Sequence, residues 1–304
     1  MKKISPLLII VLAIISTIVI QSCQTTGKAS STSKMLKFNF EKGKGYDYEM
    51  ISNTDKESNG KTTQIDLSAY YSMDVTDDDG QVKTINTAID RFRLKMEIGG
   101  LFLDIDTDKP LPNLGKSVGG KDPMKLLNSI FGAIKGQKFI MKVDAEGKIK
   151  ELAGFENMTN AIVDSLSLDE KQSQEMKQRF SQQFNSEKTK SQLERVFYIF
   201  PNREVKVGDS WQKNSVVKGE IGGNYTSTYK VTDIEGDIVT LTERTQVEPG
   251  EGNEKISGLI KGTIVVDSRL GLVVNADQDM TMTINESGKS SSIKMITKIK
   301  GKAR

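Results

Sequence analysis

The stretch IDLSAYYSMDV, Ile65–Val75, alternates apolar and polar side chains almost throughout. A period of two is typical of a half-buried antiparallel strand, because successive side chains of a strand point to opposite faces of the sheet. The same alternation occurs in four neighbouring runs between Met35 and Thr107: LKFNF, YDYEMI, INTAIDRFRLKMEI and LFLDIDT. It returns after Pro201 and continues to the end of the sequence. The sequence therefore predicts strand-rich regions before and after a middle segment.

The middle segment has the hydrophobic period of helices. Phe155, Met158 and Ile162 fall on one helical face, and Ser167 with Glu170 forms the pattern of a capping box that would start a second helix. The main helical region is therefore predicted over residues 155–199.

A shorter helix is predicted over residues 122–136. Asp122 can cap its start, Pro123 suits the first helical position, and Gly136 suits the end. The run KFIMKVDAEGKIKELAG that follows predicts a hairpin with its turn at residues 145–147.

These patterns predict an α+β fold that is mainly antiparallel β. One arrangement is a strongly curved sheet, or sheets, resembling the half-barrel of a carrier protein and closed by the helices. The other is a pair of related β units on either side of a central helical segment. Two stretches, SAYYSMDVTDDDGQVKTINT and TSTYKVTDIEGDIVTLTE, share a tyrosine-containing strand, the letters VTD, a glycine and a VxT strand, which favours a duplication.

The expected domain boundaries follow from these regions. We expect an N-terminal β-rich unit with one short helix at residues 35–152, a helical segment at 153–200, and a C-terminal β unit at 201–304. Alternatively, residues 35–304 form one compact domain.

The N-terminal segment has the features of an export signal. Lys2 and Lys3 precede an apolar run, Leu7–Ile20, that is broken only by Ser16 and Thr17. The run is shorter than the roughly 20 residues that a membrane-spanning helix needs. We expect residues 1–22 to be a cleaved signal peptide.

The end of this segment resembles the lipobox of bacterial lipoproteins, with Ile20, Gln21 and Ser22 before Cys23. The resemblance implies that Cys23 is diacylated and becomes the first mature residue. An ordinary signal peptide and a buried free cysteine are the alternatives. Residues 23–34, rich in Ser and Thr, would form a flexible tether.

The same resemblance bears on location, since it implies a bacterial envelope lipoprotein whose partner is the lipid bilayer. Gln24 is not the aspartate that retains many lipoproteins at the inner membrane, and no acidic residue occurs between Cys23 and Glu41. We therefore expect an outer membrane lipoprotein that faces the periplasm.

Composition excludes several chemistries. The chain has no histidine and one cysteine, so Ser-His-Asp hydrolysis, Cys-His proteolysis, histidine zinc sites and intramolecular disulfides are excluded. Without Lys2 and Lys3 the chain has 41 basic and 40 acidic residues. This balance predicts no nucleic-acid partner. We expect no cofactor and no metal; carboxylate, lysine and calcium chemistry remain open.

The acidic clusters are weak candidates for a site. A calcium loop with Gly80 at its sixth position would place Val75 and Asn86 where acidic ligands are needed, so residues 77–80 are better explained as a hairpin turn. Carboxylates also alternate in two runs and could act as paired acid and base: Asp104, Asp106 and Asp108, and Asp277 and Asp279. Exposed strand faces often carry this spacing.

The tetrapeptide GDSW, Gly208–Trp211, is similar to the nucleophile motif of GDSL esterases. Those enzymes need a downstream histidine, which this chain lacks, so the motif is expected to be a turn that enters a strand anchored by Trp211. VKVGDSW together with GTIVVDSRLGLVVNADQDMTMTI resembles a family of uncharacterised Bacteroides-group lipoproteins. The resemblance covers most of the mature chain and implies no activity.

Methionine is frequent on the predicted strands. Thioether side chains fill cores, but they also suit adaptable apolar pockets. The methionines concerned are Met50, Met73, Met96, Met141, Met280, Met282 and Met295.

Three function classes remain: a non-catalytic binding or carrier module for an apolar ligand, an envelope scaffold without a small ligand, and, least favoured, a carboxylate hydrolase. The carrier hypothesis predicts a cavity of several hundred cubic ångströms between the sheet and the helices. We expect no catalytic residue, and protein partners cannot be inferred from the sequence.

Overall fold

The computed structural model describes residues 33–58, 60–98, 101–109, 130–166, 168–183, 186–218, 221–250, 255–286 and 289–304. They belong to one compact unit, Ser33–Arg304. The predicted signal peptide, Cys23 and most of the predicted tether lie outside the described residues. The first strand already begins at Lys34, the last residue of that predicted tether.

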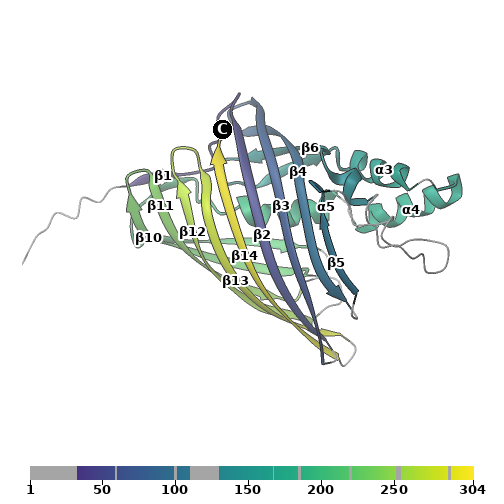
Figure 1. Cartoon of the computed structure of the whole chain (residues 1–304). Coiled ribbons are helices and arrows are strands. Elements are labelled where there is room, and N and C mark those ends of the chain that lie inside the picture. Colours follow the sequence, from purple (N-terminus) through teal and green to yellow (C-terminus); the bar gives the residue numbers. More distant parts are fainter. Residues whose placement is uncertain are drawn as a thin grey trace, which may run out of the picture. The chain divides into compact units, whose positions relative to one another are not determined.

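The protein is mainly antiparallel β, and most of its strands form one sheet (Figure 1). The strand order is β7-β6-β4-β3-β2-β14-β13-β12-β11-β10-β9, with β5 beside β4. The first half contributes β2 (Gly45–Ser58), β3 (Lys61–Asp78), β4 (Val82–Ile98), β5 (Leu101–Asp106), β6 (Lys138–Asp144) and β7 (Ile149–Ala153). The second half contributes β9 (Ser210–Val217), β10 (Gly223–Glu235), β11 (Ile238–Glu248), β12 (Lys255–Asp267), β13 (Leu272–Glu286) and β14 (Lys289–Ala303).

The alternation in the sequence becomes an alternation of burial. In β11 every second side chain is buried, and these are Val239, Leu241, Glu243, Thr245 and Val247. One face of the strand thus packs in the interior while the other faces solvent, as the period of two predicts. The interior face nevertheless includes a carboxylate and a hydroxyl.

The two strand-rich regions are parts of the same sheet. β14 pairs with β2 in an unbroken antiparallel ladder that runs from Tyr46 opposite Ala303 to Ser58 opposite Ser291. Figure 1 shows these two strands side by side in the middle of the sheet.

The sheet is not closed, since its outer strands β7 and β9 are not paired with each other. The helix α5 (Ser186–Phe197) contacts both of them. On the β9 side the amide of Lys218 donates to Ser191 Oγ at 3.0 Å. On the β7 side Lys190 Nζ lies 3.5 Å from the carbonyl oxygen of Lys150.

Two further helices precede α5. Helix α3 (Phe155–Ser165) buries Phe155, Met158 and Ile162, the face predicted from the sequence. Helix α4 (Glu170–Gln183) begins at Glu170, and its cap is Asp169, whose carboxylate accepts a hydrogen bond from the Gln172 amide. Ser167 lies outside the described residues, and Glu170 is the first helical residue rather than the third, so it does not have the position that the predicted capping box requires.

The structure also describes the end of the predicted short helix and the predicted hairpin that follows it. Residues 130–134 are helical and the chain leaves the helix at Gly136, as predicted; the predicted start at Asp122 lies outside the described residues. The hairpin β6–β7 turns at residues 145–148, which confirms that prediction. In the part of the chain that is described, no helix is long and apolar enough to cross a membrane.

A small second sheet joins the segments that lead into the two halves. β1 (Lys34–Leu36) pairs antiparallel with β8 (Arg203–Val205). Leu36 and Val205 are buried in the same hydrophobic cluster. The start of the described chain is thereby fixed to the strand that precedes β9.

Candidate functional site

A cavity of about 380 Å³ lies between the sheet and α5. Strands from both halves of the chain and the inner side of the helix form its wall. The residues that line it are Tyr48, Met50, Ser52, Leu67, Tyr71, Met73, Thr87, Phe139, Thr189, Gln192, Leu193, Arg195, Val196, Phe197, Ile221, Gln278, Met295, Thr297 and Ile299. Its position and size match the cavity expected for a carrier.

The helical wall follows from the sequence of α5. Leu193, Val196 and Phe197 recur at helical spacing and line the cavity, so they form the inner stripe of an amphipathic helix. Phe197 also contacts Phe38 and Tyr48 edge-on, at centroid distances of 6.0 and 5.6 Å. These contacts fix the C-terminal end of α5 on the hydrophobic core.

Methionine lines part of the cavity. Met50, Met73 and Met295 are in its wall, whereas Met280 and Met282 are packed in a separate hydrophobic cluster. The methionine excess in the sequence therefore has two causes, core packing and the cavity wall. Thioethers in such a wall can adapt to the shape of an apolar ligand.

A row of four polar side chains and one glycine crosses the largely apolar inner face of the sheet. The strand registers place Glu243 opposite Gly262, Gly262 opposite Gln278, Gln278 opposite Thr297, and Thr297 opposite Ser52. The last three line the cavity. We call these five residues the polar row.

The polar row lies between apolar rows that belong to two different hydrophobic clusters. On one side are Leu241, Ile264 and Ile299, and on the other are Ile260 and Met280. The protein thus has polar groups across its interior where a continuous apolar core would be expected.

Gly262 allows Gln278 and Glu243, on the strands at either side of β12, to form a hydrogen bond. A Cβ at this position would lie 2.7 Å from the Asp277 carbonyl oxygen and 2.9 Å from Gln278 Cγ. Without it, Gln278 reaches across β12 and donates from Nε2 to Glu243 Oε2 at 2.5 Å. Thr245 donates to the other carboxylate oxygen, Oε1, at 2.6 Å.

Three hydroxyl groups in the cavity wall lack a hydrogen-bond partner within the described structure. They are Tyr48 Oη, Ser52 Oγ and Thr87 Oγ1, on residues that are 5%, 7% and 1% exposed. A buried hydroxyl without a partner is unfavourable, so these groups are available to a ligand or water.

The cavity wall contains a single charged side chain, Arg195, among the described residues that form it. Its guanidinium lies over the ring of Tyr225, 4.9 Å from the centroid. Burial raises the pKa of the Tyr71 hydroxyl to about 12, so that wall residue is neutral at physiological pH.

Arg195 also lines a small recess beside the cavity, together with Glu194, Lys213 and Glu243. Lys213 forms an ion pair with Glu146 of the β6–β7 turn. Burial raises the pKa of the Glu194 carboxyl.

The carboxylates singled out from the sequence lie elsewhere. Asp106 forms a bidentate pair with Arg91, at 2.9 and 2.7 Å, and the pKa of its carboxyl is lowered to about 2 mainly by that hydrogen bonding. Asp104 lies 3.8 Å from Arg93, and Asp108 lies 2.7 Å from Lys135. The neighbours of all three are basic side chains; Asp104 and Asp108 form exposed ion pairs, whereas the Asp106 carboxylate is buried.

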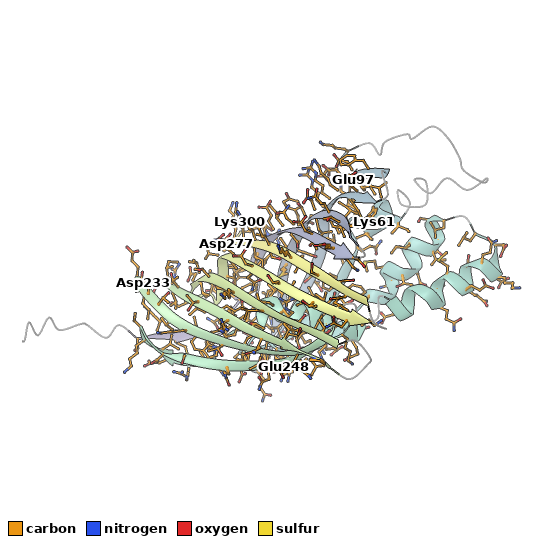
Figure 2. All side chains as sticks on the ribbon, turned by 90° about the horizontal axis from the view of Figure 1, so that it is seen from below. Lys61, Glu97, Asp233, Glu248, Asp277 and Lys300 are labelled. Carbon is orange, nitrogen blue, oxygen red and sulfur yellow. The ribbon has the colours of Figure 1, made fainter. Side chains whose placement is uncertain are left out.

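The second carboxylate run lies on β13 and is exposed. Figure 2 labels Asp277 on β13 and Lys300 on the neighbouring β14. Asp277 accepts a hydrogen bond from Asn275, and Asp279 is exposed as well. Neither residue lines the cavity.

The acidic turn is a hairpin turn, as predicted. The Asp78 carboxylate accepts from the Gly80 amide, and the Asp79 carboxylate accepts from the amides of Gln81 and Val82. Within the described residues no group of three or more acidic, cysteine or histidine side chains is arranged to hold a metal ion.

GDSW is a structural motif. The amide of Asp209 donates to the Lys206 carbonyl in the turn, and β9 begins at Ser210. The Trp211 indole donates to the carbonyl oxygen of Ile199 at 2.8 Å. The motif thereby ties β9 to the segment that follows α5.

Neither Arg195 nor the polar row was predicted from the sequence. Arg195 follows Gln192 by three positions, within about one helical turn, but polar side chains at this spacing usually face solvent. The polar row combines residues from β11, β12, β13, β14 and β2, and only the strand registers bring them into line.

Residues 80–301 match the model of a family of unknown function, DUF6263. No curated protein sequence matches the chain.

Similarity to solved structures is distant. A structure of lipovitellin, solved to show lipid-protein interactions in lipovitellin, is 10% identical, with a TM-score of 0.46. That match covers 87% of this chain, which spans about a quarter (25%) of the lipovitellin chain.

A porin and an outer membrane protein are less similar. A mutant Rh. blastica porin is 7% identical with a TM-score of 0.20, and the match covers 85% of this chain and 99% of the porin. The outer membrane protein opdK from Pseudomonas aeruginosa is 10% identical with a TM-score of 0.14, covering 80% and 63%. All three TM-scores are below 0.5.

Proposed function

Because the chain belongs to the DUF6263 family, whose function is unknown, we propose a function from the cavity itself: a non-catalytic binding or carrier module for an apolar ligand. The observation that carries this proposal is the cavity of about 380 Å³ between the sheet and α5. Ligand cavities usually have volumes of about 300–1,000 Å³ and mainly apolar walls. The volume suits one small apolar molecule or one acyl chain.

The composition of the wall supports this proposal. Leu67, Phe139 and Ile221 add apolar surface to the methionines and to the inner stripe of α5. The hydroxyls of Ser52 and Thr87 have no partner in the described structure and could be satisfied by a ligand or water. A wall of this kind gains free energy when apolar surface of a ligand replaces water.

The fold suits a carrier if the sheet is strongly curved, like a half-barrel. Contacts of α5 with both β7 and β9 support this arrangement, because one helix reaches both outer strands of a single sheet. In the proposed carrier, α5 covers the open side of the half-barrel and the ligand lies beneath it.

The proposed location is the periplasmic face of the bacterial outer membrane. The support is the sequence around Cys23, which resembles a lipobox, and the Ser/Thr-rich tether that follows. Several acyl chains on one residue hold a protein on a membrane durably, whereas a single chain binds only marginally.

Native mass spectrometry tests the carrier function. The otherwise complete chain carrying Cys23→Ala, which removes the attached acyl chains, should co-purify with an apolar molecule. Leu67→Trp should abolish co-purification because it fills the cavity. Leu94→Trp is the matched control, since Leu94 is paired with Leu67 on β4 but does not line the cavity.

The absence of bound mass in the Cys23→Ala protein and its Leu94→Trp variant would favour the scaffold function. Equal ligand content in Leu67→Trp and Leu94→Trp would place the ligand outside the cavity. Membrane fractionation tests the anchor separately: Cys23→Ala should move the protein to the soluble fraction, and unchanged membrane retention would contradict acylation.

A further inference from the structure

We propose that the cavity ligand is an amphipath with one acyl chain and an anionic head group, carboxylate or phosphate, and that Arg195 binds the head group. The inference rests on the proposed function and adds the chemical class of the ligand. It starts from the cavity wall, where Arg195 is the single charged side chain among the described residues that form it.

Arg195 is available to a ligand. Its guanidinium has five N–H donors, and no carboxylate of the described residues lies within 4.0 Å of it. The Tyr225 ring, 4.9 Å away, supports the guanidinium from one side without using its hydrogen-bond donors in the plane. The planar donor groups suit the bidentate binding of a carboxylate or phosphate.

Two of the three other charged groups in the recess have partners; the third is Glu194, whose Oε1 has no hydrogen-bond partner in the described structure and whose carboxyl pKa is raised by burial. Lys213 is paired with Glu146, and both carboxylate oxygens of Glu243 accept hydrogen bonds, one from Thr245 and one from Gln278. Glu243 is therefore held on the sheet by neutral donors. Arg195 remains as the unpaired charge of the cavity wall.

The surroundings of Arg195 also indicate how an amphipath would be oriented. Arg195 lines both the cavity and the recess that contains Glu243, so it stands where the apolar wall meets polar groups. The head group would lie at this boundary, and the acyl chain would extend along Met50, Met73 and Ile299. A guanidinium in a largely apolar wall binds an anion more strongly than one in water, because the local dielectric constant is lower.

Calorimetric titration with decanoate, decyl phosphate and decanol, below their critical micelle concentrations, tests the inference. The protein is the otherwise complete Cys23→Ala chain, freed of co-purified lipid. The anionic probes should bind about tenfold or more tightly than decanol, the effect expected of a charge-assisted hydrogen bond. Comparing the two anions separates carboxylate from phosphate as the preferred head group.

Three variants assign the effect to Arg195. Arg195→Gln should equalise the affinities for decanoate and decanol, while Arg195→Lys should keep most of the preference for the anions. Arg244→Gln is the matched control, because it removes the same charge from an exposed position on β11.

The outcomes separate this inference from the proposed function. If the Cys23→Ala protein binds decanol as tightly as the anionic probes, or if Arg195→Gln keeps the preference, the anionic head group is excluded and the apolar ligand remains. If no probe binds, both proposals fail.

Discussion

At the scale of single residues, Asp106 is the carboxylate most affected by its surroundings. Its side chain is 4% exposed and receives two hydrogen bonds from Arg91. This contact lowers the pKa of the carboxyl from 3.8 to about 2. A carboxyl with a lower pKa in the folded state stabilises the fold fully above its unfolded pKa.

Asp106→Asn should therefore lower the free energy of unfolding at pH 7 by about 2 kcal/mol. In the unchanged protein this contribution is complete above pH 4 and is lost as the pH falls from about 4 to 2. Urea unfolding at several pH values measures both effects. The difference between variant and unchanged protein should shrink across that interval.

Asp104→Asn is the control for this experiment. Asp104 lies on the same strand, is about 41% exposed and forms longer ion pairs, 3.8 and 3.7 Å from Arg93 and Lys95. Surface pairs of this kind contribute about 0–1 kcal/mol, so the variant should change stability little. Equal losses in Asp104→Asn and Asp106→Asn would contradict the role given to the buried pair.

At the scale of elements, the C-terminal end of α5 is held by the β6–β7 turn. Gly147 of this turn has φ 83°, and a Cβ there would lie only 1.7 Å from the Phe197 carbonyl oxygen. Gly80, in the β3–β4 turn, has a similar φ of 86° but no atom within 4 Å of a Cβ. The two glycines therefore have similar backbone conformations, but only Gly147 lies in close contact with α5.

Gly147→Ala and Gly80→Ala should separate these two effects. Both substitutions place alanine in a left-handed conformation, which costs about 1–2 kcal/mol. Only Gly147→Ala also forces the turn away from α5, which adds about 1–3 kcal/mol of overpacking. Thermal unfolding should show the larger loss for Gly147→Ala, and equal losses would mean that the turn does not hold the helix.

The strands, helix α3 and the turns could be predicted from the sequence, whereas the polar row and Arg195 could not. Local patterns were sufficient for the strands, for the buried face of α3 and for the turns at Gly80, Gly147 and Gly208, because each depends on neighbours in the sequence. The polar row depends on the registers of β11, β12, β13, β14 and β2, and Arg195 depends on how α5 meets the sheet. Such long-range placements have no local signal.

At the scale of the whole described unit, the two halves repeat a local structure. The amide of Gly43 donates to the Val75 carbonyl, and the amide of Gly208 donates to the Val231 carbonyl. Each of these valines precedes a shift in strand register, at Val75/Asp77 and at Val231/Asp233. The sequence similarity in the VTD segments thus corresponds to the same bulge in both halves.

A helix lies at the gap in the sheet, between its two outer strands. The second half supplies six consecutive strands, β9 to β14, whereas the path of the first half has five, β2, β3, β4, β6 and β7. After β7 the chain continues into helices, and α5 contacts both β7 and β9. The helix therefore bridges the two outer strands, and the cavity lies on its inner side.

This arrangement predicts which elements open most readily to hydrogen exchange. β2 and β14 are joined by a ladder of backbone hydrogen bonds, whereas β7 and β9 are joined through α5 by side-chain contacts and isolated hydrogen bonds. Hydrogen exchange should therefore be slowest in β2 and β14 and faster in α5, β7 and β9. Decanoate should slow exchange in α5, because a ligand in the cavity favours the closed position of the helix. Exchange in β2 and β14 that is as fast as in β9 would contradict this order, and an effect of decanoate on β14 without one on α5 would mean that the helix does not cover the ligand.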